Sequence, residues 1–155
     1  MDKILSFLFP YKHYTYAVSL FLLVLRLLFG GLIMWHGITK IVNFDTLAMS
    51  FPDPLALGAK FSLVLAIFAE AFCGVAIVAG AFYRLALIPP IFAMAMALFV
   101  VHNGDKFAMK ELAFIYLIMF VLFYIMGAGG FSLDDVVAQH LHRDKAVENH
   151  SQSAG

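Results

Sequence analysis

Two charged residues, Arg26 and Glu70, lie near the middles of long apolar stretches. Arg26 interrupts the apolar stretch 17–38, and Glu70 interrupts the stretch 61–82. An ionised group at the depth of the hydrocarbon costs roughly 3 kcal/mol or more unless it finds a partner or water. Charges in such positions are typical of proton relays, ion pathways and ligand sites. Each of the two therefore needs a partner.

The depths of these two charges predict that they pair with each other. At about 1.5 Å of rise per residue, Arg26 lies roughly 13–14 Å from the start of its stretch, and Glu70 lies roughly 18 Å from the same membrane surface. That difference is within reach of long side chains, and a guanidinium matches a carboxylate in geometry and charge. We expect an ion pair on facing helices. It acts either as a polar functional centre or only as a device that fixes helix register.

A second group of ionisable residues gathers at the other end of the apolar stretches. His36 lies near the end of the first stretch, His102 follows the third, and Glu111 precedes the fourth; Lys40 lies close in depth, with Asp105, Lys106 and Lys110. Two histidines at one level beside a carboxylate can form a proton relay, a quinone-headgroup site or a metal site. No single predicted helix carries an H-x-x-x-H or E-x-x-H pair, and this argues against a metal site. The alternative is that each histidine only hydrogen-bonds backbone or water at the membrane surface.

Helical spacing places these charges on faces rich in small residues. One face of the first stretch carries Arg26, Gly30, Ile33, Gly37 and Lys40, and the matching face of the second carries Ala66, Glu70, Cys73, Gly74 and Ile77. Glycines on such faces allow a neighbouring helix or a ligand to approach closely. We predict Glu70, His36, His102 and Glu111 as catalytic residues. We predict Arg26, Lys40, Gly37 and Gly74 as residues that bind a cofactor, and we assign no metal ligands.

The elements that must position these residues are membrane-spanning helices. The 155-residue chain is 63% hydrophobic and only 13% charged, whereas soluble domains are about 25% charged. Stretches of roughly 17 to 25 apolar residues can cross a bilayer as helices. The sequence predicts four spans, over 17–38, 61–82, 85–101 and 112–127. The predicted fold is an all-α, antiparallel four-helix bundle that forms one integral membrane domain over residues 1–155.

The connections and ends add further expectations. The segment 39–60 is too apolar for a solvated loop, so it predicts a short interfacial helix or a folded-over lid. Ser132 and Asp135 form a capping box that begins a short amphipathic helix in the polar tail 132–155, whose end we expect to be disordered. An even number of spans leaves both termini on one surface, called side A; the opposite surface is side B. Side A carries Lys3, Lys12, Arg84, Arg143 and Lys145, and side B carries Lys40, Lys60, Lys106 and Lys110.

Charge and cysteine content limit the function classes. Five positive residues against four slightly favour cytoplasmic termini in a bacterial inner membrane. The net charge is zero and no basic run is present, so nothing predicts a nucleic-acid partner. Cys73 is the single cysteine, so an intramolecular dithiol–disulfide cycle is excluded.

The order and spacing of several motifs resemble the DoxX family of small four-helix membrane proteins. The matching stretches, within about residues 20–135, are LRLLFGGLIMWHGITKI, AEAFCGVAIVAGAFYRLA, HNGDKF and GAGGFSLDD. The positions that fit the family pattern are Arg26, His36, Gly37, Lys40, Glu70, Gly74, Arg84, His102 and the run 132–134. The family is named by relation to a membrane subunit of an archaeal thiosulfate:quinone oxidoreductase. The resemblance implies a redox-associated membrane protein that handles quinone or sulfur compounds, or a partner of soluble redox enzymes.

Three functions follow as hypotheses. The first is a component of a quinone-linked oxidoreductase or membrane redox complex, with quinone as the expected ligand and a redox protein as a partner. The second is a non-catalytic scaffold or assembly subunit that holds soluble redox enzymes through the tail after Ser132. The third is a small transporter. Four short spans leave little room for a pore in one chain, so an oligomer or a larger complex is expected.

Overall fold

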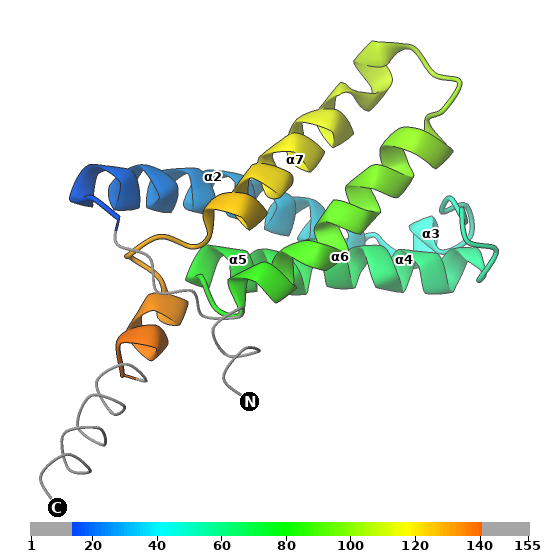
Figure 1. The fold of residues 1–155 in the computed structure, drawn as a ribbon. Coiled ribbons are helices and arrows are strands. Elements are labelled where there is room, and N and C mark those ends of the chain that lie inside the picture. The colour runs from blue at the N-terminus through cyan, green and yellow to red at the C-terminus, as the bar shows by residue number, and fades with distance from the viewer. Residues whose placement is uncertain (1–13, 141–155) are drawn as a thin grey trace, which may run out of the picture.

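Four long apolar helices make up the structure, a computed structural model that describes residues 14–140 (Figure 1). The spans are formed by α2 (Tyr16–Val42); by α4 (Ala59–Ile67), the π-helix η1 (Phe68–Phe72) and α5 (Cys73–Ala79); by α6 (Tyr83–Met96) and the π-helix η2 (Ala97–Val101); and by α7 (Phe107–Met126). All four are long and apolar enough to cross a membrane. The described residues contain no strand. The predicted all-α membrane helical bundle is confirmed.

The ends of the helices differ from the predicted spans at two informative places. α2 continues to Val42, four residues beyond the predicted end at residue 38, so Lys40 lies inside the helix. α7 begins at Phe107 and not at residue 112, which places Glu111 within its first turns. Both extensions carry polar residues, and the hydropathy of the sequence therefore ended the spans too early.

The helices form two antiparallel hairpins. α2 lies along α4, η1 and α5, while α6 and α7 make a second hairpin inclined to the first (Figure 1). The start of α2 meets the end of α7, because the Tyr14 hydroxyl donates to the Met126 carbonyl and the Tyr16 ring packs 5.6 Å from the Phe131 ring. The two ends of the described chain therefore lie at the same end of the bundle, as predicted for side A.

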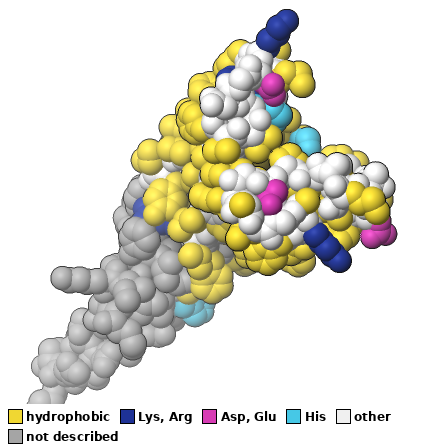
Figure 2. Space-filling view, turned by 90° about the vertical axis from the view of Figure 1, so that its right-hand side faces the viewer, with side chains coloured by type: hydrophobic (Ala, Val, Ile, Leu, Met, Phe, Trp, Pro, Cys, Tyr) yellow, Lys and Arg dark blue, Asp and Glu magenta, His cyan; other side chains and the backbone are white. Residues whose placement is uncertain are grey.

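The core lies where the two hairpins cross. Phe120 and Phe123 of α7 are buried against Ile33, Ile77 and Leu87, which come from α2, α5 and α6. Elsewhere the spans expose large apolar side chains over most of their length, and Figure 2 shows hydrophobic side chains over much of one face. An apolar exterior of this extent suits contact with lipid rather than with water.

The connection between the first two spans folds back onto the bundle. It contains the four-residue helix α3 (Phe44–Leu47), where the sequence predicts either a short interfacial helix or a folded-over lid. The rings and side chains of this connection cover the buried residues Leu63 and Ile67 of α4. Phe51 also packs on this cluster. The segment is thereby fixed over the side B end of the second span.

The chain continues as a short helix after α7. The Ser132 hydroxyl accepts a hydrogen bond from the backbone N–H of Asp135 at 3.1 Å, and residues 133–140 are helical. The predicted helix start at Ser132 is confirmed. The remainder of the predicted polar tail, 141–155, lies outside the described residues, as do Lys3, Lys12, Arg143 and Lys145 from the charge comparison.

Candidate functional site

Arg26 does not pair with Glu70, so that prediction is wrong. The guanidinium donates from Nη1 to the Ala128 carbonyl at 2.8 Å and from Nη2 to the Phe131 carbonyl at 2.6 Å. Arg26 is only 2% exposed. Its partners are backbone carbonyls of the segment that follows α7, close to side A.

The register of α2 against the second span explains the error. Close backbone approaches match Gly30 with Val78, Gly74 with Met34, and Gly37 with Ala71. In this register Glu70 lies opposite residue 38, about 18 Å along the axis from Arg26. The depth estimate placed the ends of the first two spans at one level. In fact α2 begins well beyond the turn between the second and third spans.

Several segments of the chain meet around Arg26. We call this cluster the side A cap, and it comprises Arg26, Gly80, Ser132 and Asp134. The Asp134 carboxylate accepts hydrogen bonds from the backbone N–H groups of Phe82 and Tyr83, each with an N···O distance of 2.8 Å. It thereby caps the start of α6. The backbone N–H of Asp134 donates to the Gly80 carbonyl at 3.0 Å. A Cβ at Gly80 would lie 2.6 Å from Arg26 Nη1. The cap therefore joins α2, the turn before α6 and the segment after α7.

Glu70 instead pairs with Lys40. Lys40 Nζ donates to Glu70 Oε2, joining the side B part of α2 to η1. The Glu70 side chain is 6% exposed and the Lys40 side chain 22%, so the carboxylate is buried while the ammonium keeps partial access to the surface. The pair satisfies the charge of Glu70 inside the bundle, as a buried carboxylate requires.

The π-helical turn and a glycine bring this pair together. Glu70 is the middle residue of η1, and the wider π turn is a feature that often occurs at functional sites. A Cβ at Gly37 would lie 2.7 Å from Ala71 Cα, so only glycine allows α2 to lie this close to η1. Gly74 meets Met34 in the same way, with a Cβ 3.0 Å from Met34 Cβ. The close approach that the glycines of the two faces were predicted to allow is thus present, and it serves the packing of α2 against the second span.

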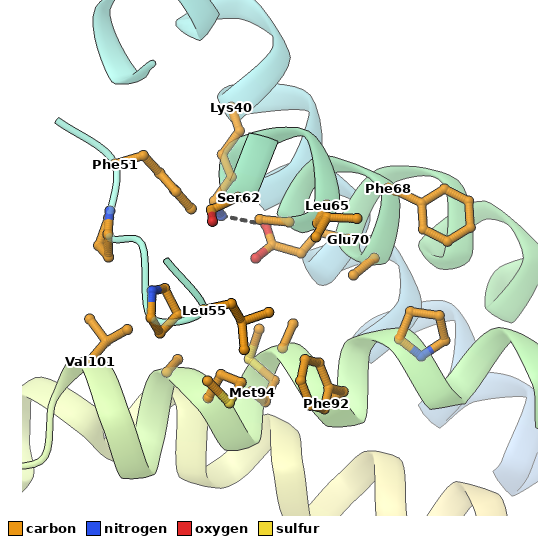
Figure 3. A pocket seen from close by; sticks show the side chains of 18 of the residues that line it. Lys40, Phe51, Leu55, Ser62, Leu65, Phe68, Glu70, Phe92, Met94 and Val101 are labelled. Carbon is orange, nitrogen blue, oxygen red and sulfur yellow. Dashed lines mark hydrogen bonds and ion pairs between the residues drawn. The ribbon is translucent and has the colours of Figure 1, made fainter. Parts of the chain in front are cut away.

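The Lys40–Glu70 pair lies in the wall of a cavity of about 540 Å³. The cavity is bounded on one side by α4 and η1 and on the other by α6 and η2 (Figure 3). Its lining is mostly apolar, and its polar side chains are those of Lys40, Ser62, Glu70 and His102. A mostly apolar cavity with a few convergent polar groups is the form that small-molecule sites take.

Both π-helical segments of the described chain border this cavity. Phe68, Ala69 and Glu70 of η1 line one side, and Ala97 and Val101 of η2 line the other. Each π turn adds a residue and displaces the helix face locally. Two such turns facing a common space indicate that the cavity is built into the fold.

The predicted catalytic residues are only partly brought together. His102 borders the cavity and its Nδ1 lies 2.7 Å from Asp105 Oδ2. His36 does not line the cavity; its ring packs edge-on against Tyr116 at 6.1 Å. Glu111 is exposed and also lies outside the lining. The described residues contain no group of three His, Cys, Asp or Glu side chains that could hold a metal ion.

Of the predicted cofactor-binding residues, Lys40 alone lines the cavity. Arg26 belongs to the side A cap, and Gly37 and Gly74 pack α2 against the second span. The cavity also contains a set of residues that sequence reasoning missed, on the segment 51–55 and on α6. The apolar character of segment 39–60 predicts a helix or a lid, and nothing in the sequence of that segment predicts which surface it covers.

Asp53 holds the segment 51–55 in place beside the cavity. Its carboxylate accepts hydrogen bonds from the Ser62 hydroxyl at 2.7 Å, the Gly58 N–H at 2.7 Å and the Leu57 N–H at 3.0 Å. The Ser62 hydroxyl foremost, and then the two backbone N–H groups, lower the pKa of this carboxyl below its ordinary value, while desolvation opposes them. The ionised form therefore stabilises the start of α4.

Four apolar spans, buried charges and an apolar exterior define a small integral membrane protein of the helical-bundle class. The chain belongs to the DoxX family, whose model matches residues 21–103. No curated protein and no solved structure matches the chain. The matched region ends before α7, and it contains every residue that lines the cavity, from Lys40 to His102.

Proposed function

We propose that the protein is the quinone-binding membrane component of an oxidoreductase complex in a bacterial inner membrane, with cytoplasmic termini. The observation that carries this proposal is the buried Lys40–Glu70 pair in the wall of an apolar cavity at the depth of the membrane. A quinone has an apolar ring and two carbonyl oxygens, and this site offers an apolar space with one ammonium donor. The DoxX resemblance supports the same class of ligand.

The chemistry assigned to the chain is binding and proton transfer. Reduction of a quinone to a quinol takes up two electrons and two protons. Cys73 alone cannot run a dithiol cycle, so the electrons would come from a partner redox protein. The DoxX resemblance suggests a sulfur compound such as thiosulfate as the electron donor. Lys40 would donate a hydrogen bond to one quinone carbonyl oxygen, and Glu70 would pass one proton to that oxygen. The second proton goes to the other carbonyl oxygen.

A route for protons runs from Glu70 toward side B. Lys40 is partly exposed beside the buried carboxylate, and the half-buried ring of His102 lies in the same cavity lining. His102 contacts Asp105 at the exposed start of the connection to α7. Groups that accept and release protons therefore extend from the cavity to the surface, which supports proton uptake from side B.

The test is a binding titration of decylubiquinone with the full-length protein in lipid nanodiscs. We expect saturable binding, and we expect Glu70→Gln to weaken it by about tenfold because the carboxylate that holds Lys40 is lost. Asp45→Asn is the matched control, since Asp45 is exposed on α3 and does not line the cavity. Absence of saturable binding, or equal affinity in Glu70→Gln and the wild type, would overturn the proposal.

A further inference from the structure

Exposed apolar side chains form one border of the cavity. Leu65 and Phe68 on the α4–η1 wall are 39% and 51% exposed, and Phe92 on the α6 wall is 52% exposed. All three also line the cavity, and Figure 3 shows Leu65 and Phe68 on one wall and Phe92 on the facing wall. Because they are both lining residues and exposed, they border the cavity at the outside of the bundle. We call this border the lateral rim.

The lateral rim lies at the depth of the hydrocarbon. Phe68 follows the start of α4 at Ala59 by nine residues, and Phe92 precedes the end of η2 at Val101 by nine residues. Each therefore lies about 14 Å from the side B end of its span. A hydrocarbon layer is about 30 Å thick, so the rim faces acyl chains near the midplane.

Apolar groups also border the side B end of the cavity. Phe51, Pro54 and Leu55 line it there, and Figure 3 shows Phe51 and Leu55 projecting from their segment toward the space between α4 and α6. The three hydrogen bonds to Asp53 hold this segment to the start of α4. Apolar side chains therefore border the cavity at this end as well, and Leu55 among them is 42% exposed.

The charges in the lining cancel. Lys40 and Glu70 are the only Lys, Arg, Asp or Glu residues that line the cavity in the described part of the chain, and they are paired. An oxyanion would have to displace Glu70 from Lys40 and leave a carboxylate buried without a cation, which is strongly unfavourable. An electroneutral headgroup can instead share the Lys40 ammonium without breaking the pair.

From these observations we infer that the cavity binds a long-chain, electroneutral amphiphile that enters from the bilayer through the lateral rim, and that soluble sulfur oxyanions do not bind there. The headgroup lies beside Lys40 and Glu70, and the chain leaves between Phe68 and Phe92 into the lipid. The inference concerns the same site as the proposed function, and it specifies the physical class of ligand and its route. If the ligand is a quinone, the sulfur donor reacts on a partner protein.

The experiment is photolabelling of the full-length protein in phosphatidylcholine nanodiscs with a diazirine-bearing dodecanol, followed by mapping of the labelled peptides. We expect saturable labelling of the peptides that contain Ala66 and Ala97, which lie on opposite walls of the cavity. Unlabelled dodecanol and decylubiquinone should compete. Dodecanoate, thiosulfate and a quinone headgroup without its chain should compete at least about tenfold less well, because they lack the electroneutral head or the chain.

Cavity-filling variants separate this site from general contact with lipid. Ala66→Trp and, independently, Ala97→Phe should lower the saturable labelling by about tenfold, because each fills the space that the ligand needs. Val75→Trp is the control: Val75 is exposed on α5 and does not line the cavity. Retained thermal stability identifies the variants that fold, and the two positions provide separate tests.

The outcomes distinguish this inference from the proposed function. Competition by dodecanol without competition by decylubiquinone would support the inference and contradict the quinone proposal. Equal competition by the short quinone headgroup, by dodecanoate or by thiosulfate would overturn the inference. Labelling that does not saturate, or that both filling variants leave unchanged while folded, would overturn it as well.

Discussion

The side A cap and the side B cavity both contain buried charge, yet they use it differently. In the cap, the Arg26 guanidinium donates to two backbone carbonyls through Nη1 and Nη2, and it packs so closely on Gly80 that a Cβ there would lie 2.6 Å from Nη1. In the cavity, Glu70 is held by one long side chain beside about 540 Å³ of space. A guanidinium that donates to fixed backbone carbonyls favours a structural role, whereas an adjustable pair beside open space favours a ligand site.

The same contrast appears in how the chain forms the two regions. The cap joins α2 to the turn before α6 and to the segment after α7, which are distant in the sequence. The cavity is formed within the part of the chain that the DoxX family model matches. The cap therefore joins the matched region to the segment after α7, whereas the cavity lies wholly within the matched region.

The largest expected effect is that of Arg26→Leu on the cap. The substitution removes two charge-assisted hydrogen bonds and leaves the Ala128 and Phe131 carbonyls without their donor. We expect the free energy of unfolding to fall by about 3 to 5 kcal/mol. Unfolding in mixed micelles, by titration with SDS, measures this loss.

Arg26→Lys sharpens the test of the cap. A lysine keeps the charge but lacks the fork that reaches two carbonyls, so it should recover only part of the lost stability. Decylubiquinone affinity of the folded fraction should stay at the wild-type value in both variants. A variant with normal stability and weakened quinone binding would show that Arg26 belongs to the ligand site after all.

Gly37→Ala has the next largest expected effect, at the contact that supports the cavity. The added Cβ would lie 2.7 Å from Ala71 Cα, so α2 must move away from η1. We expect a loss of about 1 to 3 kcal/mol in the free energy of unfolding. Gly31→Ala is a matched control on the same helix, because nothing lies within 4 Å of its Cβ. Equal stability of the two variants would contradict the close packing.

The sequence predicted the faces of the helices better than it predicted their register. The predicted face of the first span includes Arg26, Gly30, Ile33 and Gly37, and all four are buried. Periodicity reports which residues face the bundle because it depends on one helix alone. Pairing between helices depends on where each begins relative to the other, and α2 begins well before the level of the α5–α6 turn. Hydropathy does not contain that offset, so Arg26 was assigned the wrong partner.

The sequence predicts the charged residues in the wall of the cavity, but it does not predict the cavity itself. Glu70, Lys40 and His102 were selected by depth and residue type, and the structure places all three on its lining. The π turns in η1 and η2 arise from packing between helices, and the sequences FAEAF and ALFVV are typical of ordinary apolar helix. The apolar covering by segment 51–55 depends on tertiary contacts in the same way.

A double-mutant cycle on Lys40 and Glu70 sharpens the contrast between the two regions. We expect Lys40→Gln and Glu70→Gln to be coupled by about 1 to 2 kcal/mol in the free energy of unfolding, because the side chains contact each other directly. Arg26→Gln combined with Glu70→Gln should be additive within about 0.5 kcal/mol, since those residues lie about 18 Å apart. A coupling free energy between Arg26 and Glu70 well above this value would support an Arg26–Glu70 ion pair and contradict the register described above.

The smallest expected effect concerns Asp53 and pH, and it is confined to the side B region. Folding lowers the pKa of the Asp53 carboxyl, so its contribution to stability is complete above the ordinary carboxyl value of about 4 and is lost as pH falls through the lower, folded value. Protection of the Leu57 and Gly58 amides from hydrogen exchange, corrected for intrinsic rates, should therefore decrease in acid. In Asp53→Asn, protection should be lower and should no longer depend on this titration. The Tyr83 amide, which Asp134 holds in the cap, should stay protected in Asp53→Asn at neutral pH. Joint loss of protection at Leu57 and Tyr83 would show that the two regions open together and are not independent.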